Sequence, residues 1–158
     1  TYTAHAVPSY SGNMANELKK SKKYYLYDLG IRNHLLKDYR RFKEREDQGA
    51  LLESFVFLNL LCQQKPNMEI RFWRTKKGQE VDFIVVKNRV PLPVEVKSSL
   101  TDTTVPPGLA AFLRAYPKAP YGIVYNLTIQ NETICEGRKV LFKKVEEATF
   151  LDYMQTLF

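Results

Sequence analysis

Four charged residues interrupt two short apolar segments within residues 78–99, "GQEVDFIVVKNRVPLPVEVKSS". Glu80 and Asp82 lie in the first segment, and Glu95 and Lys97 lie in the second. A charged side chain in a buried strand costs free energy unless it is paired, solvated or bound to a metal ion. The four charges therefore either point to solvent or gather around a common site.

The alternation of side chains along a strand favours a common site. Glu95 and Lys97 are two residues apart, so both are expected to project from the same face of their strand. On the preceding strand, the even-numbered residues from Glu80 to Ile84 would share one face, and the odd-numbered residues would take the other. If the two strands form a hairpin, Asp82 can come close to Glu95.

Two carboxylates and a lysine that meet where the two strands approach each other would form a binding site for a hard divalent cation. Mg²⁺ binds carboxylate oxygens and keeps several of its waters. The lysine could then orient an attacking water or stabilise negative charge on a phosphate. The residue types thus indicate metal-dependent chemistry on a phosphate ester, although each charge taken singly could be a solvated side chain on an outer face.

The spacing D-x12-E-x-K of Asp82, Glu95 and Lys97 resembles the signature of the PD-(D/E)xK, restriction-endonuclease-like nuclease superfamily. In that superfamily the Asp and Glu lie on adjacent strands of a hairpin, and an earlier helix often supplies another Glu. Glu53, inside the apolar segment "ALLESFVFLNLL", matches this position. The proline of the motif's name is missing, since Val81 precedes Asp82.

The resemblance implies a catalytic set of four side chains, Glu53, Asp82, Glu95 and Lys97. The three carboxylates would hold one or two Mg²⁺ or Mn²⁺ ions, and Lys97 would help to activate or position a water. Glu80 and Gln79 would support these ligands without binding the ion themselves. An alternative for Glu53 is an ion pair with Arg71 or Arg74.

A closer resemblance covers most of the chain and rests on four motifs in order, "KKYYLYDLGIRNHLL", "GALLESFVFLNLL", "IRFWRTKKGQEVDFIV" and "PVEVKSS". They are similar to the C-terminal domain, of uncharacterised function, that follows the ATPase module in a group of prokaryotic AAA+-type ATPases. No Walker-type G-x-x-x-x-G-K-[ST] sequence occurs here. The resemblance implies an ATPase module of the same protein as partner, with ATP bound only by that absent module.

The chain of 158 residues is long enough for one domain with a proper core. Residues 1–22 are expected to be irregular or partly helical, as the linker or tail of a preceding winged-helix or ATPase region, and 23–158 to form the nuclease-like domain. The predicted order of elements indicates an α/β fold with a mixed sheet flanked by helices, in a restriction-endonuclease-like arrangement.

Hydrophobic patterns give the bounds of these elements. The predicted helices cover residues 31–42, 50–64, 106–117 and 146–158, and the second of them is apolar almost all round. The predicted strands cover residues 24–27, 68–75, 80–86, 90–99, 121–127 and 139–145. Asp28 is expected to cap the first helix, which places Ile31 and Leu35 on one face.

The formal net charge of +7 is compatible with a polyanionic partner, DNA first. Solvated basic faces on a soluble protein explain the charge equally well. The candidate DNA contacts are Arg40, Arg41, Arg74, Lys76 and Lys77, which would grip the phosphate backbone without reading sequence.

No stretch approaches the roughly 20 apolar residues of a membrane span, and no secretory signal is present. We therefore expect a cytoplasmic protein without a membrane partner. Two functions stay open: a Mg²⁺-dependent DNA endonuclease, and a non-catalytic module that binds DNA or protein and regulates the attached ATPase. The presence of all four residues of the catalytic set favours the enzyme.

Overall fold

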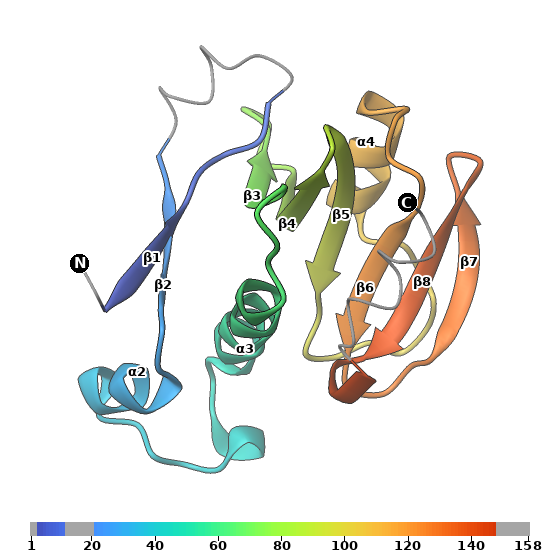
Figure 1. The fold of residues 1–158 in the computed structure, drawn as a ribbon. Helices are drawn as coiled ribbons and strands as arrows, with labels where there is room; N and C mark the ends of the chain where they lie inside the picture. The colour runs from blue at the N-terminus through green and yellow to red at the C-terminus, as the bar shows by residue number, and fades with distance from the viewer. Residues whose placement is uncertain (1–2, 12–20, 148–158) are drawn as a thin grey trace.

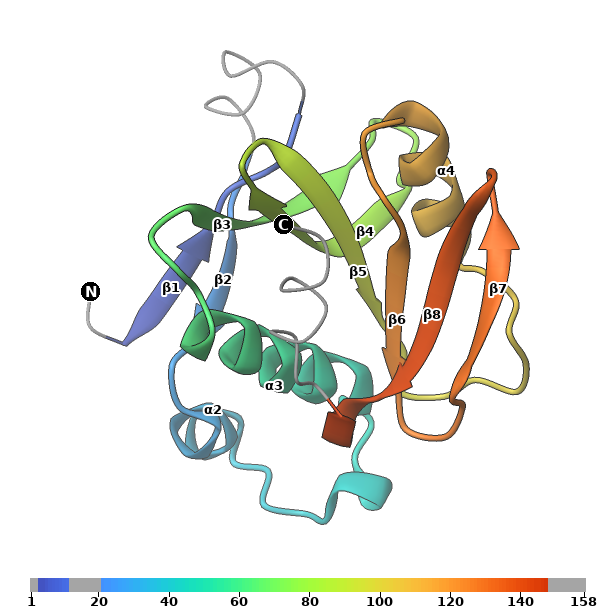
Figure 2. The same ribbon diagram turned by 45° about the vertical axis from the view of Figure 1, so that its right-hand side comes forward.

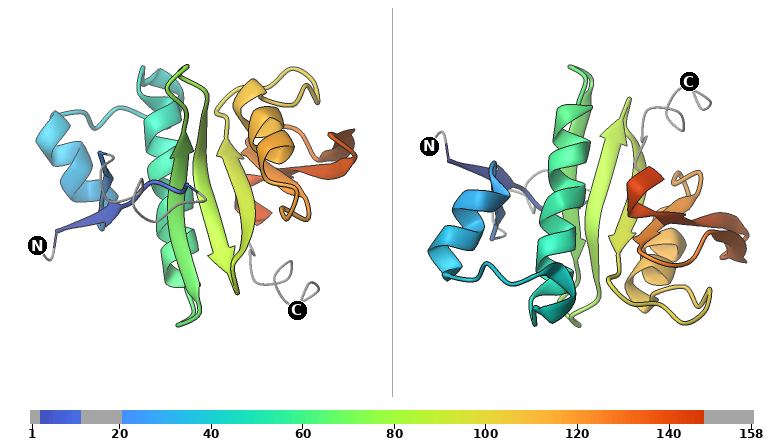
Figure 3. Two further views of the ribbon diagram at one scale, coloured as in Figure 1. Left: turned by 90° about the horizontal axis from the view of Figure 1, so that it is seen from above. Right: turned by 90° about the horizontal axis from the view of Figure 1, so that it is seen from below.

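The computed structural model describes residues 3–11 and 21–147, and its fold is α/β, as predicted. A mixed sheet of six strands forms the centre, and a separate sheet of two strands lies beside it (Figure 1). Helix α3 (Gln48–Cys62) covers one face of the large sheet, and α4 (Pro107–Ala115) covers the opposite face (Figure 3). Among the described residues, no helix is both long and apolar enough to cross a membrane.

The strands of the large sheet lie in the order β3-β4-β5-β6-β8-β7. Strands β5 and β6 are parallel, as are β6 and β8, while the other neighbours are antiparallel. The bounds are β3 Met68–Arg74, β4 Glu80–Lys87, β5 Val90–Val96, β6 Gly122–Asn126, β7 Asn131–Cys135 and β8 Arg138–Lys144. Helix α4 is the crossover between the parallel strands β5 and β6.

The two-stranded sheet pairs β1 (Ala4–Val7) antiparallel with β2 (Lys23–Leu26). The expectation of an irregular or helical segment is therefore wrong for β1, whose four residues, Ala-His-Ala-Val, are extended because β2 supplies their hydrogen bonds. A parallel bridge between Ser9 and Phe72 then joins the segment after β1 to β3. Figure 2 shows the pair of strands beside the large sheet, near one end of α3.

Two-residue turns of left-handed backbone close two hairpins of the large sheet. Asn88 and Arg89 have φ of 50° and 65° between β4 and β5, and Glu136 and Gly137 have 52° and 71° between β7 and β8. Two consecutive positive φ angles give the turn whose twist best matches paired strands. Strand β7 was not predicted, because its largely exposed edge position needs little apolar patterning.

The first predicted helix is shorter than expected and contributes nothing to the described core. Helix α2 (Leu29–Leu36) begins at Asp28, whose carboxylate accepts the Ile31 N–H at 2.9 Å, and ends before Lys37. Ile31 and Leu35, which were expected to share a helical face, are 44% and 66% exposed. A 3₁₀ helix, η1 (Phe42–Glu44), follows in place of the predicted last turn.

Two apolar layers enclose the large sheet. Phe57 of α3 packs in the first with Phe83 and Val94, and this confirms the buried helix predicted at 50–64. The second layer joins α4 to the opposite face, and it contains Leu109, Phe112, Ile84, Val124 and Val140. The chain described ends in a second 3₁₀ helix, η2 (Val145–Glu147), so most of the predicted closing helix lies outside the described residues.

Strand β4 contains a bulge at the position of the acidic motif. Arg71 pairs with Ile84 and Trp73 pairs with Val81, so β3 advances by two residues while β4 advances by three. An extra residue of this kind turns the following side chains to the other face. The prediction that Ile84 shares a face with Asp82 is therefore wrong: Ile84 lies in the α4 layer, together with Val81.

Candidate functional site

The site lies in the fork where β4 and β5 separate. Their ladder ends at the pair Phe83 and Val94, while β5 continues beside β6 as far as Val96. Beyond that last pair, the side chain of Asp82 replaces the backbone of β4 as the hydrogen-bond partner of β5. Its Oδ2 accepts the Val96 N–H at 2.9 Å. This hydrogen bond fixes Asp82 at the base of the fork.

The N-terminus of α4 reaches into the same fork. Gly108 lies so close to the backbone carbonyl of Glu80 that a Cβ atom at position 108 would overlap it. Only glycine allows this contact, which sets how far α4 can approach the start of β4. Glu80 is thereby placed on the rim of the fork.

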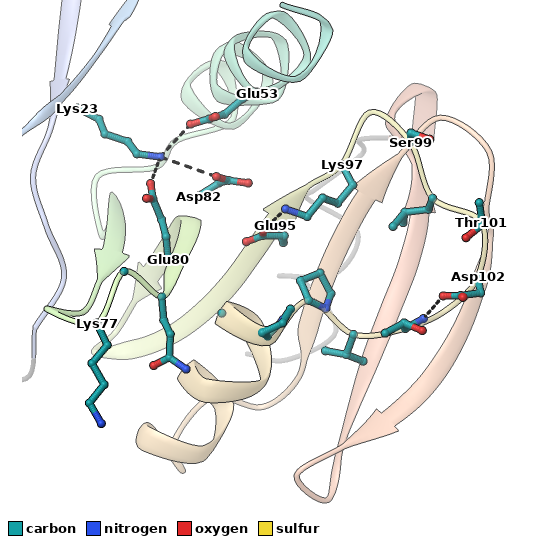
Figure 4. Close-up of a pocket in the computed structure, with 18 residues that line it drawn as sticks. Lys23, Glu53, Lys77, Glu80, Asp82, Glu95, Lys97, Ser99, Thr101 and Asp102 are labelled. Atoms are coloured by element: carbon teal, nitrogen blue, oxygen red, sulfur yellow. Dashed lines mark hydrogen bonds and ion pairs between the residues drawn. The ribbon is translucent and has the colours of Figure 1, made fainter.

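An unpredicted lysine occupies the centre of the acidic cluster. The Nζ atom of Lys23 lies 3.0 Å from Glu53, 2.5 Å from Glu80 and 3.8 Å from Asp82 (Figure 4). The other oxygen of Glu80 receives two bonds from the Arg74 guanidinium, at 2.7 and 2.8 Å. Three carboxylates from α3 and β4 thus share one ammonium group from β2.

The same strand supplies a second partner to the cluster. Tyr25 follows Lys23 by two residues, so both side chains point from β2 to one side, and the Tyr25 hydroxyl donates to Glu53. The Tyr25 ring is buried and stacks on Phe57, with centroids 4.4 Å apart. Burial and the nearby charge of Glu53 raise the Tyr25 pKa far above its usual range, so the hydroxyl stays a donor.

Glu95 and Lys97 form a separate pair on β5 and the residues that follow it. Lys97 Nζ lies 2.7 Å from Oε1 of Glu95, and Figure 4 shows this pair apart from the Lys23 group. The Glu95 side chain is only 6% exposed, and its Oε2 atom is buried without a hydrogen-bond partner. Burial raises the pKa of Glu95 despite the hydrogen bond from Lys97.

The surroundings of Asp82 disfavour its ionised form. Burial raises its pKa to about 7, with further contributions from the charges of Glu95 and Glu53. Burial lowers the pKa of Lys23, but the charges and hydrogen bonds of Glu53, Glu80 and Asp82 outweigh it and raise that pKa. The pKa of Lys97 is likewise raised, since Glu95 outweighs its burial. Both lysines are therefore ammonium ions at neutral pH.

An open pocket of about 820 Å³ contains all of these groups except Tyr25 and Arg74. Its far wall is the connection from Ser99 to Gly108, which leads from β5 into α4. The predicted set of Glu53, Asp82, Glu95 and Lys97 is brought together here, with the supporting residues Glu80 and Gln79 on the rim. The roles assigned to these residues stay predictions.

The residues predicted to contact DNA are not all near the pocket. Lys77 lines it, and Lys76 lies in the same turn between β3 and β4. Arg74 forms an ion pair with Glu80, which lines the pocket. Arg40 and Arg41 lie on the connection between α2 and η1 and are not part of the pocket wall.

Lys23 and Tyr25 belong to the site but were not predicted as its members. They lie in the first of the four motifs, "KKYYLYDLGIRNHLL", but that resemblance assigned them no contact with the acidic residues more than 25 positions away. A charged residue in a segment otherwise rich in tyrosine was the available signal.

The oxygen donors of the site match a divalent cation in chemistry but not in arrangement. These oxygens are hard, and the unpartnered Oε2 of Glu95 is a buried acceptor that a cation would satisfy. As the groups stand, however, no three His, Cys, Asp or Glu side chains among the described residues are arranged to hold a metal ion together. The Lys23 ammonium lies among Glu53, Glu80 and Asp82, at 3.0, 2.5 and 3.8 Å from their oxygens.

Comparison with known proteins gives a family without a function. The family model described as "Domain of unknown function (DUF4143)" matches residues 48–143, which include Glu53, Asp82, Glu95 and Lys97 but not Lys23. No curated protein and no solved structure matches the chain.

Proposed function

The chain belongs to the DUF4143 family, whose function is unknown, and from the geometry of its acidic pocket we propose that it is a metal-dependent phosphodiesterase acting on DNA. One observation carries the proposal: carboxylates from α3, β4 and β5 meet with Lys97 at one fork in the sheet. The D-x12-E-x-K spacing, which resembles the restriction-endonuclease-like signature, supports the same choice of function.

The composition of the pocket supports this choice of chemistry. Glu53, Asp82 and Glu95 would hold Mg²⁺ or Mn²⁺, which would supply charge stabilisation for a phosphate and an activated water. The raised pKa of Asp82 supports a cation at this position, because positive charge would relieve the repulsion from Glu53 and Glu95.

Lys97 has a distinct part in this proposal. Its side chain is 41% exposed, so it can face a substrate while its bond to Glu95 holds it in place. Because its pKa is raised, it acts as a fixed positive charge beside a phosphate and not as a base. Lys77 on the pocket wall would add a contact to the DNA backbone.

The test is Mg²⁺- or Mn²⁺-dependent cleavage of supercoiled, linear, branched and single-stranded DNA. The variants are Glu95→Gln and Lys97→Met, with Glu132→Gln on the exposed edge strand β7 as the matched control. We expect loss of cleavage in Glu95→Gln and a fall of about 100-fold or more in Lys97→Met. Equal cleavage by all folded proteins, with or without metal, would exclude this pocket as the active site.

A second function is favoured by the position of Lys23. An acidic cluster that already contains its own lysine suits a domain that binds DNA or protein without cutting, and that regulates an attached AAA+-type ATPase. This module would bind DNA with a steep salt dependence and without any metal requirement. DNA binding by the parent protein in EDTA, with no cleavage in Mg²⁺, would select this function over the first.

The ATPase partner is proposed from the sequence motifs alone. A AAA+-type module of the same protein would bind ATP and act on the DNA that this domain holds or cuts, which would place the protein in the cytoplasm. The proposal predicts that ATP hydrolysis by the full-length protein changes when Glu95 is replaced. ATPase rates of the Glu95→Gln and Glu132→Gln proteins measure this, and identical rates would contradict the coupling.

A further inference from the structure

We propose that Lys23 is the resident cation of the acidic site, which a divalent metal ion must displace before the site can be loaded. This inference rests on the proposed metal-dependent function and adds a control element to it. Lys23 lies outside the region that the family model matches, on a strand outside the six-stranded sheet.

The Lys23 ammonium contacts the kind of carboxylate oxygen that a divalent metal ion would bind. This ammonium makes ion pairs at 3.0 Å with Glu53 and at 2.5 Å with Glu80, and lies 3.8 Å from Asp82. Two of these carboxylates, Glu53 and Asp82, belong to the proposed ligand set. An ammonium and a metal ion cannot share these oxygens at contact distance, because like charges repel most strongly in a partly buried site.

The position of Lys23 is held by its surroundings. Its side chain is 19% exposed, and its ammonium also lies 5.6 Å from the centre of the Phe72 ring. Pairing of Lys23 with Val7 ties it to β1, and the bridge from Ser9 to Phe72 ties that segment to β3. The lysine is thus delivered to the site by the two-stranded sheet, a unit separate from the one that carries the acidic residues.

When the Lys23 ammonium leaves, the carboxylates of the site differ in the partners that they keep. Glu80 stays compensated by Arg74, and Glu53 stays hydrogen-bonded to Tyr25. Among the described residues, Asp82 keeps the hydrogen bond from the Val96 N–H, and Oε2 of Glu95 already lacks a partner. A divalent ion entering next to Asp82 would therefore meet carboxylate oxygens that nothing else occupies.

The test compares metal affinity in Lys23→Met and Lys77→Met. Lys77 is the matched control, because it lines the same pocket, carries the same charge and points away from the carboxylates in Figure 4. Mn²⁺ binding is measured by calorimetry and by loss of the free-ion electron paramagnetic resonance signal. We expect Lys23→Met to bind Mn²⁺ about tenfold more tightly than the parent or more, and Lys77→Met to differ by less than about twofold.

Thermal melting separates competition from misfolding. Without metal, Lys23→Met is expected to melt below the parent, and saturating Mn²⁺ should raise its melting temperature more than it raises that of the parent. Unchanged or weaker Mn²⁺ affinity in a folded Lys23→Met protein would overturn the inference. A milder variant, Lys23→Arg, keeps the charge and should leave the affinity weak, which guards against a fold defect in the methionine protein.

The outcome also distinguishes this inference from the proposed function. Tighter Mn²⁺ binding by Lys23→Met without any DNA cleavage would support the resident cation and refute the phosphodiesterase. Metal-dependent cleavage with no gain in affinity would support the phosphodiesterase and refute the resident cation. No Mn²⁺ binding by either protein at millimolar concentration would refute both.

Discussion

Replacing Asp82 by asparagine should stabilise the metal-free protein at neutral and alkaline pH. The side chain is 15% exposed, and its carboxyl group is crowded by Glu53 and Glu95. Asparagine is nearly the same size, and its carbonyl oxygen can still accept the Val96 N–H. The substitution thus removes the unfavourable charge while keeping the hydrogen bond that closes the fork between β4 and β5.

The magnitude follows from the pKa of Asp82. A shift from 3.8 to about 7 is about 3 units, and each unit corresponds to 1.36 kcal/mol of differential stability, which gives a ceiling of about 4 kcal/mol. Loss of the attraction to Lys23, 3.8 Å away, offsets part of this gain. A net stabilisation of about 1–2 kcal/mol at pH 8 is therefore expected.

The raised pKa of Asp82 also fixes the direction in which the stability of the protein changes with pH. The folded protein holds a proton on Asp82 between pH 4 and 7 that the unfolded chain has released, so the stability of the parent falls as the pH rises through this window. The Asp82→Asn protein lacks this contribution. Its advantage over the parent should be largest at pH 8, should shrink as the pH falls, and should disappear below about pH 3, where the carboxyl group is protonated in both states.

Urea denaturation in EDTA at pH 4.5, 6 and 8 measures these differences. Asp102→Asn is the control, because Asp102 lines the same pocket but its pKa is lowered by its hydrogen bonds with Thr104. That variant should gain nothing at pH 8. An Asp82→Asn protein that is less stable than the parent at pH 8, with the same pH profile, would refute the assignment of Asp82 as a strained buried carboxylate.

Three further predictions concern the framework of the site. Gly108→Ala should lower the free energy of unfolding by about 1–3 kcal/mol in urea, because its Cβ meets the Glu80 carbonyl; an unchanged midpoint would contradict this close approach. Tyr25→Phe should cost about 1–3 kcal/mol by the same measurement, since Glu53 loses a donor, and a neutral effect would mean that water replaces the hydroxyl. Phe83→Ala, at 0% exposure, should cost about 3–5 kcal/mol in thermal or urea unfolding, and a loss below 1 kcal/mol would place it outside the core.

The local pattern of the sequence was sufficient for most elements of the fold. The apolar segment at 50–64 and the alternation in the 80–96 region predicted α3 and the hairpin of β4 and β5, because burial on a defined face requires that pattern. Elements whose position depends on a partner strand were missed. Strand β1 exists through its pairing with β2, and edge strand β7 through its pairing with β8, and neither needs a strong apolar signal of its own.

The sequence by itself indicated that Asp82 and Glu95 lie on neighbouring strands, with Lys97 close to Glu95, since a short turn between two apolar segments favours a hairpin. Only the tertiary structure decided how they meet. The bulge in β4 sets the direction of Asp82, and the ammonium of Lys23 arrives from a strand 59 positions earlier in the chain. Residue spacing encodes contacts made along one hairpin. Contacts between separate sheets depend instead on how packing brings those sheets together. Such packing placed Lys23 at the centre of the acidic site.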